Sequence, residues 1–99
     1  MEVTKTQCGG KVTFAVSGRL DANAAPDFQA ELIPAFDGAN FVELDFSALT
    51  YVSSAGLRVL LLGEKTAKSK GATMSLRNVS QDIKEVFDMT GFSDILNIV

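Results

Sequence analysis

The residues of this chain best suited to chemistry are two adjacent serines, Ser53 and Ser54. A short apolar run precedes them and a helical pattern follows, so they stand where a loop becomes a helix. First-turn N–H groups and the positive end of the helix dipole favour a negative charge on a hydroxyl at that place. The pair therefore suits a hydroxyl that gains charge, although one of the two serines can equally be the N-cap of the helix.

Other familiar chemistries are excluded by composition. The chain has no His, so it cannot contain a Ser-His-Asp triad, a Cys-His dyad or a His-ligated metal site. The serine segment lacks the G-x-S-x-G pattern of a nucleophile elbow. A single cysteine, Cys8, allows neither an internal disulfide nor a CxxC pair. We therefore predict no metal, no cofactor and no enzymatic activity.

The charge balance argues against a nucleic-acid partner. Nine basic and twelve acidic residues give a formal net charge of −3, without the basic excess typical of such proteins. No apolar run approaches the length that spans a bilayer, and the first residues lack the features of a signal peptide. We expect a cytoplasmic protein whose 99 residues form one domain, residues 1–99, without insertion into a membrane.

Hydrophobic periodicity predicts a small α/β fold. We expect strands over Glu2–Gln7, Lys11–Ser17, Phe41–Phe46, Thr73–Arg77 and Ile95–Val99, and helices over Ala24–Phe36, from near Ser54 to Lys70, and from Ser80 to Gly91. Asn23 is the expected N-cap of the first helix, and Pro34 is expected to kink or end it. Phe87 and Met89 are expected in the core.

The order of these elements determines the topology. Strands separated by helices require right-handed crossovers and a largely parallel sheet, to which the first two strands add an antiparallel hairpin. Loops Gly18–Asp21 and Ser47–Ser53 would then leave the carboxyl ends of adjacent strands. Functional groups of open α/β sheets gather at that edge, so we expect Asp21 and Ser54 to lie close together.

Three segments in order along the chain carry a family resemblance. They are Gly18–Asp21 (GRLD), Leu44–Leu57 (LDFSALTYVSSAGL) and Val86–Phe92 (VFDMTGF). Together they resemble the signatures of STAS-domain anti-sigma factor antagonists, and the resemblance covers nearly the whole chain. It implies an unphosphorylated form that binds an anti-sigma factor, itself a serine kinase, and so frees a sigma factor. The phosphorylated form lets go, and a PP2C-type phosphatase restores binding.

The resemblance also assigns residues. It places the phosphoacceptor on Ser54, and it leaves Ser53 as the alternative because many members carry Asp where this chain has Ser53. It places the Asp of the GxLD motif on Asp21, which is otherwise a turn or cap residue. The implied partner-binding residues are Asp21, Ser53, Ala55, Gly56, Leu57 and Arg58.

Two other functions remain open. Another STAS role, as an accessory subunit of a lipid-transport ATPase complex or a component of a stress-signalling scaffold, would use the same fold. A small-molecule-binding domain or enzyme of flavodoxin-like shape is disfavoured, because no Gly-rich phosphate loop follows a strand and no carboxylate cluster converges.

Overall fold

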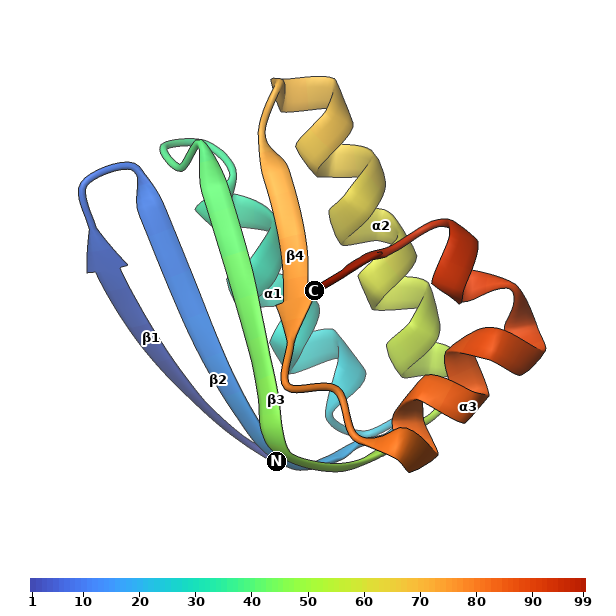
Figure 1. The fold of residues 1–99 in the computed structure, drawn as a ribbon. Coiled ribbons are helices and arrows are strands. Elements are labelled where there is room, and N and C mark those ends of the chain that lie inside the picture. Colours follow the sequence, from blue (N-terminus) through green and yellow to red (C-terminus); the bar gives the residue numbers. More distant parts are fainter.

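The computed structural model describes all residues, 1–99, as one sheet of five strands in the order β1-β2-β3-β4-β5, with helices packed against it (Figure 1). The strands are β1 (Glu2–Cys8), β2 (Lys11–Leu20), β3 (Phe41–Val52), β4 (Thr73–Arg77) and β5 (Asn97–Ile98). The helices are α1 (Ala25–Ala35), α2 (Ser54–Lys70) and α3 (Gln81–Thr90), and a 3-10 turn spans Phe92–Asp94. β1 pairs with β2 antiparallel and every other pair is parallel, which confirms the predicted fold class.

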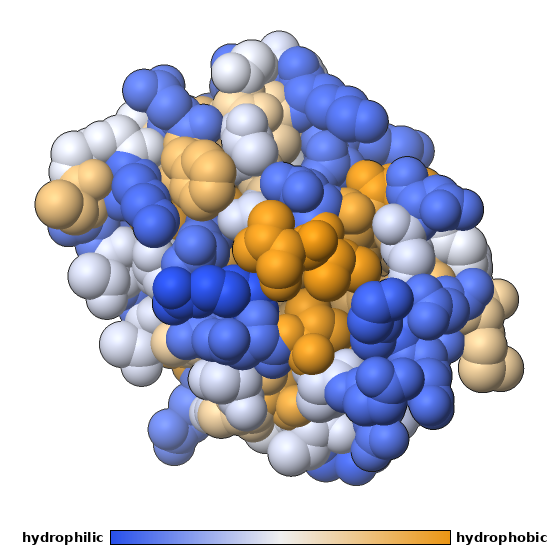
Figure 2. All heavy atoms as spheres, viewed as in Figure 1, coloured by the Kyte–Doolittle hydropathy of each residue, from blue (hydrophilic) through white to orange (hydrophobic).

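Alternation of apolar and polar side chains in the first half of β3 separates the two faces of the sheet. Val42, Leu44 and Phe46 of β3 are buried on the face covered by α1 and α2, which lie behind the sheet in Figure 1. The intervening Glu43 and Asp45 occupy the opposite face, where both form ion pairs with Arg77. That face carries no helix and is largely hydrophilic in Figure 2. An apolar patch near the C-terminal end interrupts it, where Val99 is exposed.

The strands β2 and β3 are longer than predicted. Gly18, Arg19 and Leu20 continue β2, and residues 47–52 continue β3, so most of the two expected loops is strand. The pairing persists because register shifts between Ala15 and Ser17 and between Gly18 and Arg19 absorb the irregular backbone. Conversely, the predicted strand Ile95–Val99 is reduced to β5, because the N–H groups of Ile95 and Leu96 donate back to the carbonyl oxygen of Phe92 and so belong to the 3-10 turn.

The helix ends agree with the sequence predictions at α3 but not at the start of α1. Ser80 caps α3 by accepting from the N–H of Ile83, and Gly91 ends this helix, at the two residues predicted. Gly71 and Gly91 end α2 and α3 in the left-handed conformation that favours glycine. The prediction of Asn23 as N-cap was wrong: α1 begins after Ala24, and neither residue caps it with a side chain.

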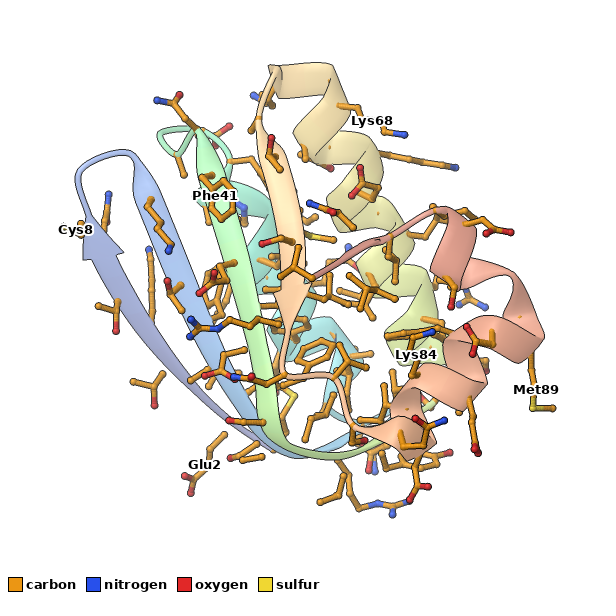
Figure 3. All side chains as sticks on the ribbon, in the orientation of Figure 1. Glu2, Cys8, Phe41, Lys68, Lys84 and Met89 are labelled. Atoms are coloured by element: carbon orange, nitrogen blue, oxygen red, sulfur yellow. The ribbon has the colours of Figure 1, made fainter.

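The end of α1 and the burial of two side chains in α3 were also predicted. Pro34 lies inside α1, which ends one residue later, because a proline lacks the N–H of a helical hydrogen bond. Phe87 is fully buried as predicted, but Met89 was wrongly assigned to the core. It is 86% exposed and points away from α3 (Figure 3), since the third helix turns only one face to the sheet.

No helix combines the length and the apolar character that crossing a membrane requires.

Candidate functional site

The carboxyl ends of β2 and β3 meet where the sequence placed the site. Leu20 pairs with Val52, and the N–H of Ser53 donates to the carbonyl oxygen of Leu20 at 2.9 Å. Asp21 and Ser53 are therefore the first residues beyond two adjacent paired strands. α1 makes the crossover between these strands, so the predicted proximity of Asp21 to the serine pair is correct (Figure 1).

The two serines differ in what their hydroxyls do. Ser53 is the N-cap of α2 and is half-buried, and its Oγ accepts from the N–H of Gly56 at 3.1 Å. Ser54 is the first residue of α2, is exposed, and its side chain makes no hydrogen bond within the chain. Ser54 therefore presents a free hydroxyl at the positive end of a 17-residue helix, whereas the Ser53 hydroxyl already stabilises that end.

Gly56 brings the start of α2 against the sheet. A Cβ atom at this position would lie 2.8 Å from the backbone oxygen of Leu20 and 3.0 Å from a methyl carbon of Val52. No larger residue fits without moving the helix. The close packing of Gly56 against the strand ends is thus a property of the fold itself.

Asp21 organises the turn that leads into α1. Its Oδ1 accepts from the N–H groups of Asn23 and Ala24 at 3.1 and 3.0 Å, the work expected of a capping side chain. The other carboxylate oxygen, Oδ2, accepts no hydrogen bond within the chain. Asp21 is therefore a turn residue whose half-buried carboxylate keeps one oxygen without a hydrogen bond in the chain.

The remaining residues assigned by resemblance divide into buried and accessible ones. Gly56 and Leu57 are buried on the inner face of α2, so they support the site from below. Ala55 is half-buried and Arg58 is exposed. Ser54 and Arg58 are four residues apart and so share one face of the helix.

One feature of this edge was missed in the sequence. Arg19 and Tyr51 pair across β2 and β3, and the Arg19 guanidinium lies 4.1 Å from the centre of the Tyr51 ring, a cation–π contact. Both residues were assigned to loops, where no register links them. Had the strands been extended through the GRLD and LTYV segments, parallel pairing would have indicated the contact.

The side chains with shifted pKa values lie away from this edge. The Asn78 amide donates a hydrogen bond to Asp45, which ties the turn after β4 to β3 and lowers the pKa of Asp45. The Ser93 hydroxyl lowers the pKa of Asp88. Burial raises the pKa of Glu64 on the inner face of α2. No three His, Cys, Asp or Glu side chains lie together as metal ligands would.

Comparison with known proteins identifies the family. A model of the STAS domain, described as "Mlab, STAS domain", matches residues 3–98. The chain belongs to the STAS domain family. This confirms the family indicated by the three segments and accounts for the sheet with its N-terminal antiparallel hairpin.

Individual relatives carry more specific names. BtrV of Bordetella bronchiseptica, assigned as an anti-sigma factor antagonist, is 32% identical over 99 residues, covering 99% of this chain and 85% of BtrV. The anti-sigma-B factor antagonist of Bacillus subtilis is 29% identical over 83 residues, covering 84% and 76% of the two chains.

Solved structures share the fold. The anti-sigma factor antagonist SpoIIAA in its unphosphorylated form matches with a TM-score of 0.85 at 18% identity, covering 99% of this chain and 88% of that one. The phosphorylated form of this Bacillus protein matches with a TM-score of 0.79, covering 99% and 91%.

Proposed function

We propose that this STAS domain, residues 1–99, is a phosphorylation-switched anti-sigma factor antagonist of the cytoplasm. In its unphosphorylated form it binds an anti-sigma factor that is also a serine kinase, and so frees a sigma factor for transcription. A PP2C-type phosphatase reverses the modification. The observation that carries the proposal is the free, exposed hydroxyl of Ser54 at the start of α2, beside Asp21.

The relatives support the same role. Two of them are named as antagonists of anti-sigma factors, and SpoIIAA has been solved in unphosphorylated and phosphorylated forms. The chain itself supplies no catalytic group in this proposal. The partner holds ATP and performs the chemistry, and this chain presents the hydroxyl.

The geometry favours Ser54 over Ser53 as acceptor. Transfer forms a bond between Ser54 Oγ and the γ-phosphorus of ATP, breaks the bond to the bridging oxygen, releases ADP and passes the hydroxyl proton to a base on the kinase. The new phosphate carries about −1.5 to −2 charges and meets the N–H groups of the first helical turn. Modification of Ser53 would instead use the Oγ atom that already accepts the cap hydrogen bond from the N–H of Gly56.

The test is phosphorylation by the anti-sigma factor kinase of the source organism, followed by mass spectrometry. Wild type and Ser53→Ala should each gain one phosphate on Ser54, and Ser54→Ala should gain none. Phosphorylated wild type should lose affinity for the kinase. Equal modification of Ser54→Ala would refute the assignment, and a chain that neither binds nor is modified would favour another STAS role, such as an accessory subunit.

A further inference from the structure

A groove of about 500 Å³ runs between α1 and α2 and begins at the serine edge. Seven of its eleven lining residues are hydrophobic. The apolar wall includes Pro26, Ala30 and Ile33 from α1, and Ala55, Val59 and Leu62 from α2. Part of this wall lies outside the hydrophobic core, because Pro26, Ala30 and Leu62 are exposed. A continuous apolar groove on a monomer is typical of a surface that another molecule covers.

Small side chains keep the groove open. Ala30 and Ala55 face it where longer side chains would fill it, while the helices approach closely at Gly63. A Cβ atom on Gly63 would lie 2.9 Å from a methyl carbon of Leu32. The two helices are therefore held together beneath the groove, and its floor does not depend on what occupies it.

The charge in the groove is one-sided. Arg58 is the only charged residue that lines the groove, and Gln29 is the only uncharged polar one. Arg58 takes part in none of the ion pairs of the chain, although the chain carries a net charge of −3. An exposed guanidinium beside an apolar surface complements an occupant that brings a carboxylate at this end.

We infer that the groove docks an amphipathic helix of the anti-sigma factor, with an acidic residue of that helix paired to Arg58. The inference rests on the proposed function. A kinase that reaches the Ser54 hydroxyl must lie against Ala55 and Arg58, one residue and one turn further along α2, and these two residues open the groove. Its surface therefore continues from the acceptor into the groove.

The dimensions suit a helix. Ala55 to Leu62 covers eight residues, whose seven steps rise about 10 Å along α2, so the groove holds about two turns of a helix. A helix in such a groove buries side chains spaced i, i+4 and i+7 on one face. The short side chains of Ala30 and Ala55 leave room in the groove for large aliphatic side chains on the occupant.

Two groove variants and two matched controls test the inference by calorimetric titration with the purified anti-sigma factor of the source organism. Leu62→Asp and Ala30→Arg should each weaken binding tenfold or more. Met89→Asp changes another exposed hydrophobic residue, and Glu31→Arg changes the residue next to Ala30 on α1. Both controls should bind within twofold of wild type, and circular dichroism melting should show all four variants folded.

Hydrogen exchange on the partner provides the second measurement. A helical segment of the anti-sigma factor should be protected by wild type and not by Leu62→Asp. If both groove variants bind like wild type while phosphorylated wild type does not bind, the proposed function stands and the groove inference fails. If ultracentrifugation shows a dimer that Leu62→Asp dissociates, the occupant is a second copy and the inference is wrong. If unphosphorylated wild type does not bind, both proposals fail.

Discussion

At the scale of single residues, Gly56 sets the distance between α2 and the sheet. In Gly56→Val, atoms placed 2.8 Å from the Leu20 backbone oxygen would force the helix outward. Overpacking of this kind costs about 1–3 kcal/mol, so the free energy of unfolding in urea should fall by that amount. Gly38→Ala is the control, because nothing lies within 4 Å of its Cβ position, and its stability should be unchanged. Equal stability of the two variants would show that α2 adjusts without cost.

Asp21 has two separable roles, a turn and a charge. Asp21→Ala removes the oxygen that accepts from Asn23 and Ala24, and it should destabilise the fold by about 0.5–2 kcal/mol, as loss of a cap does. Asp21→Asn keeps that oxygen and should stay close to wild-type stability. It should nevertheless slow phosphorylation of Ser54 or weaken partner binding, because it removes a negative charge from the sheet edge that Asp21 shares with the two serines. Wild-type phosphorylation kinetics and affinity in Asp21→Asn would leave Asp21 a turn residue alone.

At the scale of elements, α2 carries a carboxylate on its buried face. Glu64 is 8% exposed, and its Oε1 has no hydrogen-bond partner. Burial raises its pKa, so the folded state binds the proton more tightly than the unfolded state does. The contribution of Glu64 to the free energy of unfolding is therefore complete below pH 4.5, the ordinary pKa of a Glu side chain. It is lost as the pH rises through the raised pKa of the folded state.

Glu64→Gln removes this pH dependence because the amide stays neutral. The variant should be more stable than wild type at pH 7, and the difference should shrink toward pH 4. Thermal melting across this range measures it, with the exposed Glu31→Gln as the control that should follow wild type at every pH. A Glu64→Gln variant less stable than wild type at pH 7 would mean that the charged form is stabilised in the fold.

At the scale of the whole molecule, phosphorylation should change binding and leave the fold intact. A phosphate on Ser54 lies at a helix N-terminus, where negative charge is favourable by roughly 0.3–1 kcal/mol, and Arg58 lies one turn away on the same face. In the proposed complex, the same phosphate would have to be desolvated in a partner surface that fits a hydroxyl. Each 1.4 kcal/mol of that cost is about tenfold in affinity.

Phosphorylated and unphosphorylated chains should therefore melt within a few degrees of each other, while affinity for the anti-sigma factor falls at least tenfold. Parallel melting and titration of the two forms measure both quantities. The buried core of 24 hydrophobic residues lies apart from the exposed Ser54 side chain, so no large unfolding is expected. A large drop in melting temperature on phosphorylation would show that the switch acts by destabilising the domain.

Several features were determined by the sequence alone because they depend on a few neighbouring residues. The alternation of Val12, Phe14 and Val16 defined a strand with one buried face. Ser80 and Gly91 marked the ends of α3, since a side-chain cap and a left-handed glycine act within one turn. The order of strands and helices then determined a largely parallel sheet, and with it the edge shared by Asp21 and Ser54.

Other features were decided only by the tertiary structure, because they depend on residues far apart in the chain. The register between β2 and β3 extended both strands to Leu20 and Val52 and stacked Arg19 on Tyr51. Adjacent serines have the same local propensity. The pairing of β2 with β3 makes Ser53 the first residue beyond the strand, and so the N-cap of α2, which leaves the hydroxyl of Ser54 free. The groove arises from the spacing of two helices, which no local pattern in either helix encodes.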